Sequence, residues 1–130
     1  MDSYAWIEYF AGSAKGKSAT KYVESSGPAT PTVVIAELSR KLLGETLAGR
    51  ETVAGRLERL RFVRSSTVVL DLTDEVAVVA GEIDVERKEK VRDWGLADSI
   101  VLATARESGA KVVTGDKHFN DLGAEIVFLA

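Results

Sequence analysis

The residues of this chain that could do chemistry are carboxylates. Cysteine is absent and His118 is the single histidine, which excludes thiolate nucleophiles and zinc sites built from several histidines. Four acids stand at special places, namely Asp2, Glu37, Asp98 and Asp116. If these acids meet, their charges repel one another and raise each pKa unless a cation neutralises them. Hard divalent ions with oxygen ligands, Mg²⁺ or Mn²⁺, are therefore the expected cofactors, and such a site suits phosphodiester hydrolysis.

The stretch around the last two acids is the clearest element of the sequence. Its apolar pattern predicts a helix from about Ser99 to Glu107 that stops at Gly109, a natural left-handed cap, followed by a buried strand from Lys111 to Thr114. Asp98 stands at the start of this helix, on the face that packs inward. Asp116 follows the strand at its carboxyl end, where open α/β sheets keep their sites. The two acids are therefore expected to converge.

The rest of the chain alternates helices with short strands. Periodicity and capping residues predict helices over 4–10 with Ser3 as N-cap, over 19–24, and over 31–44 with Pro31 in first position. Two further helices are predicted, one marked by Val53, Leu57 and Leu60 and one over 73–92 with a solvated end from Asp84 to Arg92. A loop is predicted over 12–18, and strands over 65–72 and 125–129. This order predicts an α/β fold, a three-layer sandwich with a central, mostly parallel sheet and helices on both faces. At 130 residues, one domain spanning 1–130 is expected.

Each acid also has a purely structural interpretation. Asp98 could cap its helix, and Asp116 could be a turn residue. Glu37 could pair with Lys41 one turn later, and Asp2 could be solvated near the chain terminus. Joint placement at the ends of elements favours a shared role, but the sequence leaves both interpretations open.

Overall charge and hydropathy limit the possible partners. The net charge is −3 and the pI about 5.2, so the chain is not a generally basic nucleic-acid binder. Segment 50–64 is locally basic, with five arginines against two glutamates. Arg56, Arg59 and Arg61 could contact nucleic-acid phosphates, or form a solvated face or a surface for an acidic partner. No apolar run approaches the ~20 residues that span a bilayer and there is no secretory prefix, so we expect a cytoplasmic protein without membrane association.

Taken together, these motifs resemble those of PIN domains, and specifically of the VapC-type toxin ribonucleases. The resemblance is carried by Met1-Asp2-Ser3, Ala36-Glu37-Leu38, Leu96 to Ala105 and Val112 to Phe119. It implies a metal-dependent endoribonuclease that uses Mg²⁺ or Mn²⁺ to cleave RNA. It further implies a homodimer and a small antitoxin protein as partner. Carried over by position, Asp2, Glu37, Asp98 and Asp116 become the metal-binding acids, and Thr114 the supporting hydroxyl.

The sequence departs from the pattern of these ribonucleases at two places. Members usually have an apolar strand before the first acid, whereas here only Met1 precedes Asp2. Members also often carry a further acid two residues after the last one, where this chain has His118. That histidine could touch the substrate, or it could be an incidental surface residue.

Other functions are compatible with part of this pattern. A catalytically weak PIN-like module could act by binding protein or RNA, although four intact acids disfavour a mere scaffold. An RNA-processing nuclease without an antitoxin would share the same chemistry. A phosphoacceptor receiver domain also gathers acids at strand ends, but it needs a strand before the first acid and a late lysine at a strand end, and the sequence predicts neither.

Overall fold

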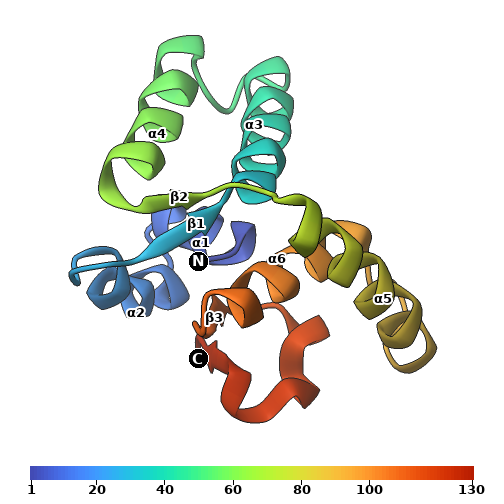
Figure 1. Ribbon diagram of the computed structural model, residues 1–130. Helices are drawn as coiled ribbons and strands as arrows, with labels where there is room; N and C mark the ends of the chain where they lie inside the picture. The colour runs from blue at the N-terminus through green and yellow to red at the C-terminus, as the bar shows by residue number, and fades with distance from the viewer.

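The computed structural model describes all 130 residues and has the α/β organisation that the sequence predicts. The elements in chain order are α1 (Ser3–Ala11), α2 (Ala14–Val23), β1 (Ala29–Pro31), α3 (Thr32–Leu47), α4 (Val53–Ser66), β2 (Val68–Leu70), α5 (Asp74–Lys90), α6 (Leu96–Glu107), β3 (Val112–Thr114), the 3-10 segment η1 (Lys117–Glu125) and β4 (Ile126–Phe128). Helices surround the short strands, with the α3–α4 hairpin extending from one end of the molecule (Figure 1).

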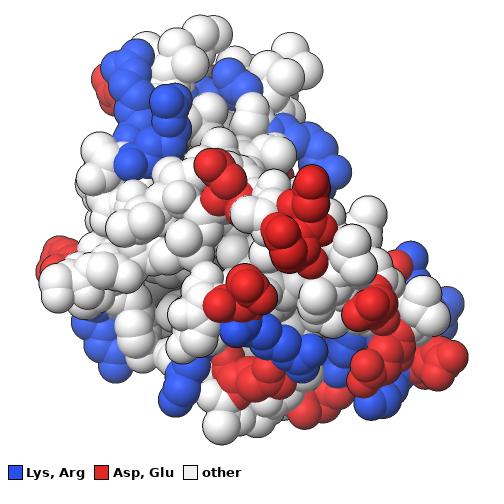
Figure 2. Space-filling model, in the orientation of Figure 1, with Lys and Arg blue, Asp and Glu red and all other residues white.

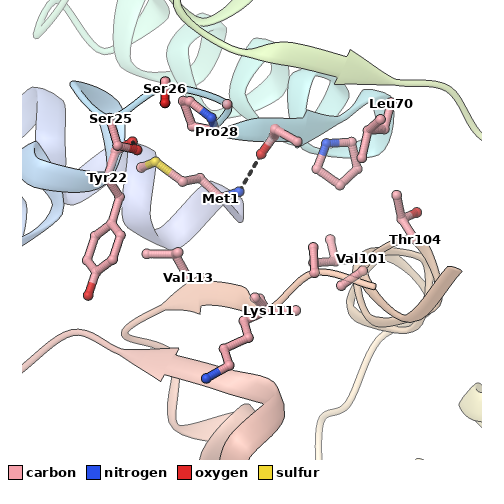
Figure 3. Close-up of a pocket in the computed structure, with 16 residues that line it drawn as sticks. Met1, Tyr22, Ser25, Ser26, Pro28, Leu70, Val101, Thr104, Lys111 and Val113 are labelled. Atoms are coloured by element: carbon pink, nitrogen blue, oxygen red, sulfur yellow. Dashed lines mark hydrogen bonds between the residues drawn. The ribbon is translucent and has the colours of Figure 1, made fainter. Parts of the chain in front are cut away.

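The strands are all parallel but form two pairs, β1 with β2 and β3 with β4, whereas the sequence predicts one continuous sheet. The first two residues of the chain lie between these pairs. The Met1 amine donates to the carbonyl oxygen of Ala29 (2.6 Å), as Figure 3 shows, and the Asp2 amide donates to that of Val113 (3.2 Å). Two residues join the pairs by single hydrogen bonds but are too few to form a strand between them.

An apolar cleft of about 190 Å³ opens beside the seam between the two strand pairs, where Met1 and Asp2 lie. It is lined by Met1, by the chain around β1 and β3, and by Val101 of α6 (Figure 3). No Asp or Glu lines it. The cleft is therefore separate from the acids that the sequence singles out.

The core lies where α1, α3, α6 and η1 meet. Trp6, Leu38, Leu102 and Phe119, one from each of these elements, are completely shielded from solvent. The predicted inward face of α6 is confirmed, since Val101 is buried beside Leu102. None of the helices is both long enough and apolar enough to cross a membrane.

The predicted loop over 12–18 is wrong, because α2 begins at Ala14. The hydroxyl of Ser13 caps this helix by accepting from the amide of Gly16 (3.0 Å). At Gly16 the helix passes so close to α1 that a Cβ would lie 1.9 Å from the carbonyl oxygen of Glu8. Gly16 therefore permits close helix packing, whereas Gly12, with a φ of 66°, ends α1 and makes the short turn into α2.

Two further boundaries differ from the prediction. The strand expected over 65–72 is shorter, because α4 continues to Ser66. Pro31 ends β1 and α3 starts at the next residue, so the sequence misses a three-residue strand that is too short to show a period. On α4 the buried apolar residue is Val63, whereas Val53 and Leu57 are 67% and 42% exposed.

Candidate active site

Asp2 is buried at the start of α1, where both of its carboxylate oxygens accept hydrogen bonds. One oxygen accepts from the amide of Ala5 (3.0 Å), which makes Asp2 the N-cap of this helix. The other accepts from the hydroxyl of Thr114 (2.6 Å). The residue is only 5% exposed, so the interpretation of Asp2 as a solvated terminal residue is wrong. The prediction of Ser3 as N-cap is also wrong, because Ser3 already belongs to the helix.

Thr114, fully buried at the end of β3, connects the first and last acids. Its hydroxyl donates to Asp2 and accepts from the backbone amide of Asp116 (3.0 Å). The carboxylate of Asp116 in turn accepts from the amide of His118 (2.9 Å) and so caps η1. Asp116 is therefore a turn residue, in agreement with its structural interpretation, and it also lies next to the first acid.

Asp98 and Asp116 face the same imidazole. The distance from His118 Nδ1 to Asp98 Oδ2 is 3.7 Å, and the distance from this nitrogen to Asp116 Oδ1 is also 3.7 Å. Asp98 Oδ2 additionally accepts from the amide of Gly95 (3.1 Å) at the start of α6. Asp98 therefore caps its helix, as one interpretation predicts, and its carboxylate also lies beside the imidazole that Asp116 approaches.

Glu37 reaches this group from α3. It does not pair with Lys41, which bridges to Glu45 instead (3.0 Å). Burial raises the pKa of Glu37, and the charges of Asp98 and Asp116 raise it further. An influence of this kind acts only between groups that are near in space. The structure therefore brings all four acids named from the sequence into one neighbourhood.

The electrostatics of this neighbourhood reflect burial first and repulsion between the acids second. Burial raises the pKa of Asp2 to about 7, and the charge of Asp116 adds to the rise. Burial also raises the pKa of Asp98, and the charge of Asp116 again adds to the rise. Asp116 is the one acid whose charge acts on all three others. A cation bound here would reverse these shifts.

The donor set fits a divalent metal ion in its chemistry, although not in its present arrangement. No three His, Asp or Glu side chains are arranged in this structure to hold an ion as they stand. Four carboxylates nevertheless supply the hard oxygen donors that Mg²⁺ or Mn²⁺ takes. The terminal torsions of Asp and Glu are soft, so rotation of these side chains can bring the oxygens closer together.

Comparison with known proteins identifies the fold. The family model of the PIN domain matches residues 1–125. The chain belongs to the PIN domain family. A solved structure, a toxin-antitoxin complex from Klebsiella pneumoniae, has a similar fold, with 21% sequence identity and a TM-score of 0.74 over 99% of this chain and 95% of that one. No curated protein matches the chain in sequence. PIN domains are generally nucleases, which agrees with an acidic site at the carboxyl end of β3.

Arg87 is a residue of this PIN domain that sequence reasoning misses. The sequence predicts it on a solvated stretch of α5, but it is only 4% exposed. Its guanidinium binds both carboxylate oxygens of Asp121 (2.7 and 2.8 Å) and the carbonyl oxygen of His118 (2.9 Å), and it lies over the ring of Trp94. Arg87 thus fixes the segment that follows Asp116. Alternating charges along α5 hide it, because they give no sign of burial.

Seven of the 17 Lys and Arg residues lie on the α3–α4 hairpin. Arg56 donates to the hydroxyl of Ser39 (2.6 Å) and Arg59 to the carboxylate of Glu51 (3.0 Å), whereas Arg61 is exposed. In the view of Figure 2, Lys and Arg gather over this hairpin and acidic side chains gather below it. A shallow groove beside Glu37 carries further basic residues, namely Arg40, Lys41 and Arg50. The sequence signal for this groove is Arg40, one helical turn after Glu37.

Proposed function

We propose that this PIN domain is a metal-dependent endoribonuclease that hydrolyses phosphodiester bonds of RNA. The observation that carries the proposal is the position of Asp116, which lies beside the same imidazole as Asp98, is connected to Asp2 through Thr114 and raises the pKa of Glu37 by its charge. Asp2, Glu37, Asp98 and Asp116 would hold Mg²⁺ or Mn²⁺. When bound, such an ion supplies Lewis acidity toward a water molecule and toward a phosphate oxygen.

The chain's own residues do the positioning. Thr114 holds the carboxylate of Asp2 from one side while the amide of Ala5 holds it from the other. The amide of Gly95 fixes one oxygen of Asp98 at the start of α6. These contacts supply the outer support that acidic metal sites need, since the orientation of a ligating carboxylate is set by its hydrogen bonds.

RNA would approach the acids from the α3–α4 hairpin. The groove with Arg40, Lys41 and Arg50 lies directly beside Glu37, and Arg56, Arg59 and Arg61 follow on α4. Because the chain as a whole is acidic, contacts to RNA phosphates depend on such local basic residues. Backbone phosphates would then follow the hairpin toward the site.

We further propose that the protein is the toxin of a VapBC-type pair, with a small antitoxin and a homodimeric state. The fold of the Klebsiella pneumoniae toxin-antitoxin complex supports this assignment. An RNA-processing nuclease without an antitoxin is the second candidate, because its acidic site would be identical. A gene for a small DNA-binding protein next to this one would favour the toxin.

RNA cleavage with defined ions tests the enzyme. The purified protein should cleave a mixed RNA panel with Mg²⁺ or Mn²⁺ and stop when a chelator is added. Asp98→Asn and Asp116→Asn should each reduce cleavage at least ~100-fold, the scale of losing one preorganised electrostatic contact. Glu107→Gln is the matched control, because it neutralises an exposed acid at the opposite end of α6. Full activity in both site variants, or an unchanged rate with chelator, would contradict the proposal.

A further inference from the structure

His118, the single histidine of the chain, lies between two carboxylates without a hydrogen bond to either. Its Nδ1 is buried and has no hydrogen-bond partner. The nearest carboxylate oxygens, on Asp98 and Asp116, both lie 3.7 Å away, which is beyond hydrogen-bond length. A buried polar atom without a partner is uncommon in folded proteins and needs a specific explanation.

The backbone of His118 is held by contacts on both sides. The backbone amide of His118 donates to Asp116 (2.9 Å), and its carbonyl oxygen accepts from Arg87 (2.9 Å). Arg87 is itself buried and held by Asp121. The side chain of His118 is only 23% exposed. The interpretation of His118 as an incidental surface residue does not fit this environment.

Resting on the proposed function, we infer that His118 Nδ1 is a ligand of the same divalent cation as Asp98 and Asp116, and that this nitrogen makes the site prefer Mn²⁺ over Mg²⁺. Two donors bound to one ion at about 2.1 Å lie about 3 to 4.2 Å apart, depending on the angle between them. The two nitrogen-to-oxygen distances of 3.7 Å lie inside that interval.

Ligand chemistry gives the direction of the preference. Mg²⁺ takes oxygen donors and gives up its water reluctantly, whereas imidazole nitrogen suits transition-metal ions. A PIN domain that carries an acid in place of His118, two residues after the last metal-binding acid, offers oxygen donors alone. Here His118 offers nitrogen beside two carboxylates, so the affinity for Mg²⁺ falls relative to that for Mn²⁺.

Pulsed electron paramagnetic resonance of the Mn²⁺-loaded protein tests the ligand directly. Because the chain has one histidine, an imidazole nitrogen coupled to bound Mn²⁺ can come only from His118. We expect this nitrogen signal in the wild-type protein and its loss in His118→Asp. The same substitution should lower the ratio of Mn²⁺ to Mg²⁺ affinity at least ~10-fold by calorimetry, since ligand-sphere changes have effects of that size. Asn120→Asp, which adds an acid at an exposed position of the same segment, should leave both unchanged.

The possible outcomes separate the two proposals. Mn²⁺ binding and RNA cleavage without an imidazole signal, or with an affinity ratio unaffected by His118→Asp, would overturn the inference and leave the proposed function in place. Failure of the wild-type protein both to bind either ion and to cleave RNA would overturn both. The wild-type spectrum requires no variant, so a variant that does not fold cannot obscure the answer.

Discussion

Two charged clusters adjoin η1, one around Arg87 and Asp121 and the other around Asp2, Asp98 and Asp116, and their charges are compensated differently. In the first cluster, Arg87 binds Asp121 through two hydrogen bonds, and this contact lowers the pKa of Asp121. In the second cluster, burial raises the pKa of Asp2 and Asp98, and the charge of Asp116 raises both further. One cluster has its charges paired, and the other has an excess of negative charge.

The difference separates a structural role from a functional one. The Arg87–Asp121 pair joins a buried guanidinium to a half-exposed carboxylate, so its two charges compensate each other and need no added cation. Buried carboxylates that repel one another reduce the stability of the folded protein until a cation joins them. A bound cation would therefore neutralise the excess negative charge beside Asp116. The Arg87 cluster holds in place the segment that follows this acid.

Breaking the paired cluster should have the largest effect on stability. Arg87→Ala removes the hydrogen bonds to Asp121 and to the carbonyl oxygen of His118 and empties the space over Trp94, so the free energy of unfolding should fall by ~1.5–3 kcal/mol. Arg106→Ala is the matched control, because Arg106 also binds a carboxylate, that of Glu125, through two hydrogen bonds, but its own side chain is exposed. Its expected cost is below ~1 kcal/mol. Equal losses in urea titrations of the two variants would show that burial of Arg87 is unimportant.

Neutralising one member of the unpaired cluster should raise stability and abolish cation binding. Asp2→Asn removes a buried charge, so at pH 7 the metal-free variant should be more stable than the wild type by on the order of 1–3 kcal/mol. Added Mn²⁺ should raise the melting temperature of the wild-type protein and not that of the variant. A metal-free variant that is less stable than the wild type at pH 7 would show that the carboxylate of Asp2 does not destabilise the metal-free protein.

The pH dependence gives this prediction its sign. Because the pKa of Asp2 is raised from 3.8 to about 7, the folded protein binds more protons than the unfolded chain between those values, and metal-free stability falls as pH rises. The Met1 amine acts oppositely: burial lowers its pKa from 8.0 to about 6, so its contribution to stability rises between those values. Urea midpoints at pH 4.5 and pH 6 therefore isolate the acids, and Asp2→Asn should reduce the fall between them.

The hydroxyl that joins two acids allows a finer test. Thr114→Val keeps the shape of the side chain but removes the donor to Asp2 and the acceptor for the Asp116 amide. Affinity for the divalent ion should fall by about 10–100-fold, as for other removals of outer-sphere hydrogen bonds. Thr114→Ser keeps the hydroxyl and should keep most of the affinity. Calorimetry with Mn²⁺ measures both, and equal affinities in the Val and Ser variants would reject this role of Thr114.

The smallest effect is expected outside both clusters, on α4. Replacing Arg56, Arg59 and Arg61 with Ala should weaken RNA binding and reduce its dependence on salt, by about 0.7 in the logarithmic slope for each phosphate that these arginines neutralise. Catalysis on bound RNA should persist, because the acids are untouched. A salt titration of binding, with the Asp98→Asn variant used to prevent cleavage, measures the slope. An unchanged slope would assign these arginines to another surface.

Local sequence signals predict the elements that carry strong apolar patterns and miss those that depend on distant contacts. Helix α6 and strand β3 follow from apolar runs punctuated by Gly109. Helix α2 has a weak apolar pattern, and its place depends on close packing of Gly16 against α1. Burial of Arg87 likewise depends on a partner 34 residues away. No local pattern encodes such contacts.

The candidate site shows the same division. The order of the four acids along the chain and the resemblance to PIN domains are enough to name them. Their hydrogen bonds could not be predicted, since Asp2 and Thr114 are 112 residues apart. The environment of His118 was also beyond prediction, because it depends on where α5 and α6 place Arg87 and Asp98.

The seam between the two strand pairs has a mechanical consequence. Met1 binds one pair and Asp2 binds the other, while the side chain of Asp2 is part of the acidic site. An ion held by Asp2 would therefore tighten the joint between the two strand pairs, which are not hydrogen-bonded to each other directly. Amide protons of β1, which form no hydrogen bond with the acids, should then exchange more slowly with solvent when the divalent ion is bound.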